Sequence, residues 1–138
     1  MRAINPDQIK DNVIELIGKE WMLVSAGDKE KFNMMTASWG GVGVLWNRPV
    51  VFAFIRPERY TREFIDARNE FTITFLGPEH RKAHSICGSK SGREIDKVDR
   101  YGVDAALYGG LATRYSRKLA LRWNAKWSIS PRSRRPSF

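Results

Sequence analysis

Residues 33–61 of the chain are NMMTASWGGVGVLWNRPVVFAFIRPERYT. They begin inside a strand-like segment, Phe32–Trp39, which is followed by three glycines in the next four positions. A second apolar segment, Val50–Arg56, has the composition of a short buried strand, and Pro57 stops it. Glycine in a strand indicates a bulge or a backbone that another group approaches closely. The stretch therefore predicts two strands around a glycine-rich segment that is open to a neighbour or a ligand.

The rest of the chain supplies short helices and further strands. Upstream, Asn5-Pro6-Asp7 begins a predicted helix that ends at Gly18, and Trp21–Val24 follows as a strand. Downstream, the patterns predict a helix over Tyr60–Ile65, an alternating strand over Phe71–Phe75 and a helix over His80–Cys87. Short strands with intervening helices are typical of an antiparallel barrel and not of a doubly wound parallel sheet. We therefore expect a mainly β fold with helical additions.

Length and composition narrow the class of protein. A chain of 138 residues with 42% apolar residues suits one compact domain. No apolar run approaches the roughly 18–20 residues that cross a bilayer, and the first dozen residues have no apolar signal core. The single cysteine, Cys87, cannot form an internal disulfide. We expect a cytoplasmic protein with no membrane partner.

The net charge of +9 would ordinarily indicate a nucleic-acid or anionic-membrane partner, but it is unevenly distributed. Eight basic residues and no acidic ones follow Leu111: Arg114, Arg117, Lys118, Arg122, Lys126, Arg132, Arg134 and Arg135. Without these eight, 16 basic residues face 15 acidic ones, so residues 1–111 carry about +1. The basicity belongs to the tail, and we predict no nucleic-acid partner for the domain.

Familiar catalytic patterns do not occur in the sequence. It contains no phosphate loop, no GxGxxG between strand and helix, and no Gly-x-Ser-x-Gly elbow. His80 and His84 are four residues apart, but no acidic residue or cysteine is well placed beside them, so we expect no metal site. Cys87 is interpreted as a small buried thiol. We predict no catalytic side chain.

Two turns are rich in groups that bind anions. Residues 55–61 offer two guanidinium groups and two hydroxyls, those of Arg56, Arg59, Tyr60 and Thr61. If Thr61 caps the following helix, free backbone N–H groups and the helix dipole point at the same place. Residues 88–93, GSKSGR, form the second turn. Each turn, taken alone, is better explained as a solvated loop that carries incidental charge.

The strand before the glycines favours a planar ligand beside this anion site. Thr36, Ala37 and Ser38 are small, so a flat ring can lie against their backbone amides, and Trp39 and Trp46 could flank it. An anion site next to a planar slot fits flavin mononucleotide (FMN) better than a polymeric nucleic acid.

Three segments carry a resemblance to a known family: INPDQIKDN (4–12), the stretch at 33–61, and ICGSKSGREIDKV (86–98). Over roughly residues 4–108 the chain resembles the flavin reductase-like family with the FMN-binding split β-barrel fold, on its flavoredoxin side. The resemblance implies a homodimer with one FMN per subunit near the interface. It also implies transfer of hydride or electrons from NADH or NADPH through flavin to free flavin, a redox protein or an iron chelate. A non-enzymatic FMN electron carrier and an inactive truncated member are the alternatives.

The resemblance also implies three groups of cofactor-binding residues. The isoalloxazine ring would be lined by Thr36, Ala37, Ser38 and Trp39. The phosphate would be held by Arg56, Arg59, Tyr60 and Thr61. The segment that closes over flavin or nicotinamide would supply Ser89, Lys90, Ser91 and Arg93. Because the flavin itself carries the hydride chemistry, no catalytic side chain is required.

The C-terminal tail departs from the family pattern, which continues into further barrel strands with an acidic pair. Synonymous codons for residues 114–138, read two bases later, can encode VFEETRLALECKMVYFTPLSAAVF, which alternates like a strand and contains that pair. We therefore interpret residues 1–111 as a split-barrel domain without its C-terminal strands. Residues 112–138 are interpreted as a basic tail that is either frameshifted near residues 109–112 or disordered. A nucleic-acid- or acidic-lipid-binding arm around Trp123 and Trp127 is a further alternative.

Overall fold

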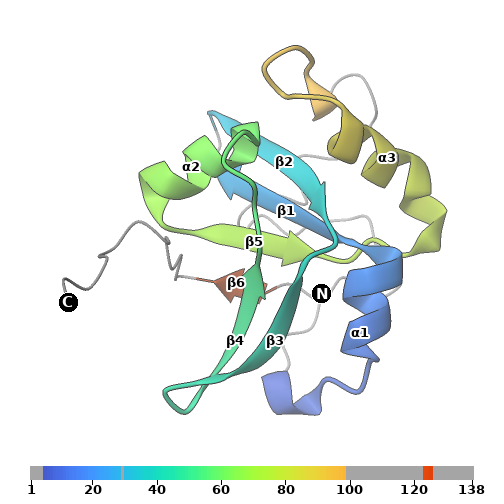
Figure 1. The fold of residues 1–138 in the computed structure, drawn as a ribbon, viewed down its shortest axis with the longest axis vertical. Helices are drawn as coiled ribbons and strands as arrows, with labels where there is room; N and C mark the ends of the chain where they lie inside the picture. The colour runs from blue at the N-terminus through green and yellow to red at the C-terminus, as the bar shows by residue number, and fades with distance from the viewer. Residues whose placement is uncertain (1–4, 29, 99–122, 126–138) are drawn as a thin grey trace, which may run out of the picture.

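The computed structural model of the chain describes residues 5–28, 30–98 and 123–125. Two antiparallel sheets form its framework (Figure 1). The first sheet has the order β2-β1-β5-β6, with β1 at Met22–Gly27, β2 at Phe32–Ala37, β5 at Phe71–Thr74 and β6 at Trp123–Ala125. The second sheet is the hairpin of β3, Gly40–Leu45, and β4, Arg48–Ala53. The predicted mainly β fold with helical additions is confirmed.

Strand β1 is the central element, paired with β2 along its whole length and with β5 on its other side. Met22, Val24 and Ala26 belong to one hydrophobic cluster and Leu23 to a second one. Because successive side chains of a strand point to opposite faces, β1 is buried on both faces of the sheet. This explains why its sequence is continuously apolar at the start and does not alternate with charged residues.

Two helices cover these two faces. Helix α2, Tyr60–Arg68, packs Ile65 into the cluster of Met22 and Val24. Helix α3, Arg81–Ser89, packs Cys87 against Leu23 in the second cluster. Both helices were predicted, with slightly shorter or shifted bounds. Both contact β2, which places residues from α2 and α3 beside one strand (Figure 1).

The single helix predicted from Asn5 to Gly18 is wrong. The segment instead forms three short helical pieces: η1 at Pro6–Gln8, α1 at Val13–Glu15 and η2 at Leu16–Glu20. The side chain of Asn12 accepts from the amides of Ile14 and Glu15 at 3.1 and 3.3 Å, so a second helix start interrupts the first. η3, Pro78–His80, likewise precedes α3 as a separate turn.

The glycine-rich segment is a separate strand and not a bulged extension of the preceding one. β2 ends at Ala37 and β3 begins at Gly40. A Cβ on Gly40 would overlap the Phe52 carbonyl of β4, so this glycine allows the two hairpin strands to approach. Trp46 and Asn47 both have positive φ, 49° and 58°, which gives the two-residue turn that matches the twist of a hairpin. The glycine-rich segment was expected to face a neighbour or a ligand, and at Gly40 that neighbour is β4.

Part of the tail enters the sheet. The backbone of β6 pairs with β5, with Ala125 opposite Phe71. The remainder of the tail, residues 112–122 and 126–138, lies outside the described residues, so the interpretation of 112–138 as frameshifted or disordered stays a prediction. Within the described ranges no helix has the length and apolar character to cross a membrane.

Candidate functional site

The three segments predicted to bind a cofactor lie next to one another. We call residues 36–39 the β2 end, residues 56–61 the α2 turn and residues 88–93 the α3 end. The Thr36 hydroxyl donates to the His84 carbonyl in α3 at 2.6 Å, and a Cβ on Gly88 would lie 3.6 Å from Cβ of Thr36. From the α2 turn, Arg59 Nη1 donates to the Gly88 carbonyl at 2.9 Å. Gly88 is therefore the point where the three segments meet.

Arg59 connects α2 to α3. Its second terminal nitrogen donates to the carbonyl of Cys87 at 3.2 Å, so the guanidinium bonds two carbonyls at the C-terminus of α3. A cation is favoured there because the last carbonyls of a helix lack partners and carry the negative end of the dipole. Burial lowers the pKa of this guanidinium, with the nearby Arg56 charge acting in the same direction. Arg59 thus has a structural role, and its predicted phosphate contact stays a prediction.

Thr61 does not cap α2, so the condition under which its hydroxyl would mark an anion-binding helix start is not met. The helix begins at Tyr60, and the N-cap is Arg59, which makes no side-chain capping bond. Thr61 is fully buried, and its hydroxyl accepts a hydrogen bond from Nδ2 of Asn33 at 2.9 Å. The hydroxyl is therefore turned toward β2, where it satisfies a buried amide.

The α3 end folds back onto α2 through Arg93. The Arg93 guanidinium lies 4.5 Å over the Tyr60 ring and pairs with the carboxylate of Glu63. Gly92 lies so close to Asn33 of β2 that a Cβ on it would overlap the amide side chain. Ser89 and Lys90, at the end of α3, are exposed, and the Ser91 hydroxyl accepts from the Arg93 amide at 3.2 Å.

Three of the residues predicted in the β2 end and the α2 turn are exposed, and they are Ser38, Trp39 and Arg56. Ser38 and Trp39 follow β2, and the Trp39 side chain is 62% exposed. The Phe54 amide donates to the Trp39 carbonyl at 2.9 Å, which brings the end of β4 beside the β2 end. Arg56 follows directly and makes an exposed ion pair with Glu58 at 3.2 Å. A hydroxyl, an indole ring and a guanidinium are thus accessible on the β2 end and the segment after β4, whereas Ala37 is buried and can offer only its backbone.

The backbone of β2 adds hydrogen-bonding capacity. In the part of the chain that the structure describes, β2 pairs with β1 alone and is an edge strand. Lys97 donates to the Met34 carbonyl of β2 at 2.7 Å from a buried position, and burial lowers the pKa of its ammonium group. Peptide groups on an edge strand can bond the carbonyls and nitrogens of a planar ring.

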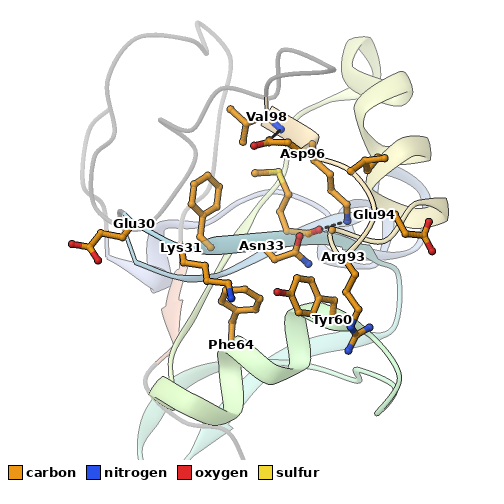
Figure 2. A pocket seen from close by; sticks show the side chains of 14 residues that line it. Glu30, Lys31, Asn33, Tyr60, Phe64, Arg93, Glu94, Asp96 and Val98 are labelled. Carbon is orange, nitrogen blue, oxygen red and sulfur yellow. Dashed lines mark hydrogen bonds between the residues drawn. The ribbon is translucent and has the colours of Figure 1, made fainter.

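A cavity of about 470 Å³ opens beside the start of β2. Figure 2 shows Tyr60 and Phe64 of α2 on one side of it and Arg93 with the following loop on another. Tyr60 and Arg93 are the predicted site residues in its lining, and the β2 end is not part of the lining. The cavity and the exposed β2 end therefore lie along the same strand, at its beginning and its end.

The two histidines do not act as a pair. His84 is 1% exposed and lies edge-on to the Trp21 ring, whereas His80 is exposed. Burial, together with the charges of Arg81 and His80, lowers the pKa of His84 to about 4. No group of three or more His, Cys, Asp or Glu side chains that could hold a metal occurs among the described residues.

Sequence reasoning missed three buried polar residues that build the junction: Asn33, His84 and Lys97. Asn33 is a polar residue flanked by Phe32 and Met34. A polar residue within an apolar strand could have been recognised as a hydrogen-bonding site. Lys97 lies in a charged segment, REIDKVDR (93–100), and nothing in the sequence distinguishes it from an exposed lysine. His84 was considered as a metal ligand or as part of a surface or partly buried helix, and its bond to Thr36 was not foreseen.

A profile of the flavin reductase like domain matches residues 15–111. Because this match covers most of the chain, the protein belongs to the flavin reductase-like family. The resemblance found in the sequence is confirmed, and it agrees with the antiparallel sheet and hairpin described above.

Solved structures with similar folds include two flavoredoxins. The flavoredoxin of Desulfovibrio vulgaris (Miyazaki F) is 28% identical, with a TM-score of 0.54 over 59% of this chain and 45% of that one. The flavoredoxin from Methanosarcina acetivorans is 30% identical, with a TM-score of 0.55 over 68% and 48%. An FMN-binding domain of a flavin reductases-like enzyme from Shewanella baltica OS155 shares the fold at 21% identity, with a TM-score of 0.58 over 82% and 56%. The chain spans about half the length of these solved proteins, and no functionally curated protein matches it.

Proposed function

We propose that the protein is an FMN-binding oxidoreductase that passes hydride or electrons from NADH or NADPH to free flavin or a redox partner. The observation that carries the proposal is the convergence of the β2 end, the α2 turn and the α3 end at Gly88. This convergence supports a site in which one mononucleotide spans the edge of β2 and the cationic α2 turn. Membership of the flavin reductase-like family supports the same conclusion.

The residues at the junction fit FMN in part. Exposed Ser38 and Trp39 offer a hydroxyl and an aromatic face to the ring, and the edge of β2 offers peptide groups. Exposed Arg56, with the Tyr60 hydroxyl, offers the charge for a phosphate. Arg59 and Thr61 support this surface from beneath, since their side chains already bond α3 and β2. Ser89, Lys90, Ser91 and Arg93 are proposed to cover the cofactor or the nicotinamide.

FMN, when bound, would supply two-electron redox chemistry, which no side chain of this site could do. The protein's part is to bind and orient. Trp39 would cover one face of the ring, and backbone donors along β2 would favour negative charge on it. Arg56 neutralises the phosphate. We therefore propose no catalytic acid or base.

Flavin uptake tests this assignment. The purified chain is mixed with FMN and desalted, and the absorbance in the flavin bands is measured. We expect retained FMN in the wild type and about tenfold weaker binding in Arg56→Gln, because a charged hydrogen bond to phosphate is lost. Arg48→Gln, which removes an exposed arginine at the opposite end of β4, is the matched control and should bind normally. A colourless protein after desalting, or equal binding by the two variants, contradicts the assignment.

A non-enzymatic FMN electron carrier is the second candidate, favoured by the similarity to two flavoredoxins. Anaerobic mixing with NADH and with NADPH distinguishes the two. Bleaching of the flavin band within seconds supports the enzyme, and bleaching only with a reduced protein partner supports the carrier. A chain that binds no flavin at all would be an inactive family member.

We further propose a homodimer, with the apolar residues of the β3–β4 hairpin at its interface, and a cytoplasmic location, in keeping with the free thiol of Cys87. We also propose that residues 1–111 form the flavin-binding unit and that residues 112–138 arise from a frameshift. The family match over residues 15–111 supports that division. The nucleotide sequence tests it: a one- or two-base change near codons 109–112 must restore the expected strand.

A further inference from the structure

His84 is a buried polar residue at the proposed site that no step so far has used. It lies in the second turn of α3 and is 1% exposed, enclosed by Thr36 of β2 and the ring of Trp21. Its Nδ1 lies 3.3 Å from the Thr36 hydroxyl oxygen. Its Nε2 is buried and has no hydrogen-bond partner among the described residues. A buried nitrogen without a partner requires an explanation.

The geometry determines which ring nitrogen carries the proton. The Thr36 oxygen and the His84 carbonyl oxygen are 2.6 Å apart, so a hydrogen lies between them, and the carbonyl has none to give. The single hydrogen of the Thr36 hydroxyl is thus committed to that carbonyl. The contact with Nδ1 is then a hydrogen bond only if Nδ1 is the donor. With the ring neutral at pH 7, as its lowered pKa of about 4 implies, His84 is the Nδ1–H tautomer. The nitrogen without a partner, Nε2, is then an unprotonated acceptor and not a buried N–H donor.

This arrangement fixes Thr36 by two bonds to one residue. The hydroxyl donates to the His84 main chain and accepts from its ring, so neither the rotamer of Thr36 nor its distance from α3 is free to change. Thr36 is half-buried and is the first residue of the β2 end. We propose that His84 is a positioning residue that sets the β2 end, through Thr36, for the planar ring; this rests on the proposed flavin function.

Nuclear magnetic resonance of protein labelled with ¹⁵N in its two histidines tests the tautomer without any cofactor. His80, exposed and in η3, is assigned by its loss in His80→Asn. We expect the His84 Nδ1 signal at the position of a protonated ring nitrogen and the Nε2 signal at that of an unprotonated one. An Nε2–H tautomer, or a cationic ring at neutral pH, overturns the proposal.

Binding measurements test the positioning role. His84→Leu removes the donor to Thr36 and should weaken FMN binding about five- to tenfold, as expected for one lost hydrogen bond. His84→Asn places an amide N–H near the Nδ1 position and should restore most of the affinity. His80→Asn should leave it unchanged. In a Thr36→Val background, His84→Leu should have no further effect, because the acceptor is already gone.

The outcomes separate this proposal from the proposed function. If wild-type protein takes up no FMN, the proposed function fails, and the positioning role fails with it, while the tautomer is still decided by the nitrogen spectrum. If the wild type binds FMN and His84→Leu lowers stability without changing FMN affinity, His84 is only a core residue and the proposal alone is overturned.

Discussion

Two regions of the molecule differ in which residues they bury. The junction of β2, α2 and α3 buries polar side chains, whereas the β3–β4 hairpin exposes apolar ones. At the junction, buried Asn33, Thr61 and His84 are bonded across segments distant in sequence. On the hairpin, large apolar side chains are exposed, among them Val44 and Trp46 at 76% each. A surface that exposes such residues usually meets a partner. The comparison teaches that the junction is fixed by internal bonds, whereas the hairpin presents apolar side chains that the described residues leave exposed, as the proposed dimer interface requires.

The largest expected effect breaks the junction at Gly92. Gly92→Ala forces a Cβ into the Asn33 side chain, which cannot yield because it is buried and bonded to Thr61. We expect a loss of about 2–3 kcal/mol in the free energy of unfolding, measured by urea denaturation. The hairpin control is Gly43→Ala, which has open space around the new methyl and should change stability by less than about 1 kcal/mol. Equal effects would mean that the close approach at Asn33 is unimportant.

The pH dependence of stability sharpens the same contrast. The pKa of His84 is about 4 in the folded chain against 6.5 for the free side chain, so the unfolded state takes up a proton first as pH falls. The contribution of neutral His84 to the free energy of unfolding should thus be fully present above pH 6.5. The free energy of unfolding should fall by about 2–3 kcal/mol as pH drops from there toward 4. His84→Asn should remove this part of the slope. A wild-type slope that persists in the variant would assign it to other groups.

The two arginines of the α2 turn are expected to have different roles, Arg59 in stabilising the fold and Arg56 in binding the phosphate. Arg59→Gln removes the bonds to the carbonyls of Cys87 and Gly88 and should cost about 1.5–2 kcal/mol of stability. Arg56→Gln removes only an exposed ion pair and should cost less than about 0.5 kcal/mol. Thermal denaturation of the two variants without flavin measures the difference. If Arg56 proves the more costly, the division of roles is reversed.

The smallest expected effect on stability lies on the hairpin. Val44→Lys places a charge on a side chain that is already exposed, so the unfolding of a monomer should change by less than about 0.5 kcal/mol. If the hairpin is the dimer interface, the same change should lower the sedimentation-derived mass to that of one chain. A dimer that survives Val44→Lys places the interface elsewhere.

The elements with strong local patterns could be predicted from the sequence. The sequence of β5 alternates apolar and hydroxyl residues, which predicted the strand correctly, although the expected half-buried pattern is wrong because all four of its residues are buried. The helix after Pro57 has an apolar face with Ile65 at its centre. The fold class follows from these short elements, and the three site segments were found because charge, hydroxyls and glycine are concentrated in them. The β2 end and the α2 turn could therefore be named before their contacts were known.

The errors arise where a distant partner decides the structure. Thr61 has the side chain of an N-cap, but Asn33, 28 residues earlier, bonds its hydroxyl. Gly40 resembles a ligand-facing glycine, but its neighbour is the Phe52 carbonyl. Asn12 starts a new helical segment inside the apparent helix of the N-terminus. Local propensity contains no information about such pairings, since they are made only when the strands and helices pack.

The single thiol of the chain offers a direct view of how α3 opens. Cys87 is completely buried, burial raises its pKa, and its carbonyl is one of those that Arg59 bonds. An alkylating reagent can react only when α3 leaves β2, because both access and the thiolate are required. The rate of labelling therefore counts opening events of one helix. A cofactor seated across the β2 end should slow it, so occupancy can be followed by mass spectrometry without reference to colour or turnover.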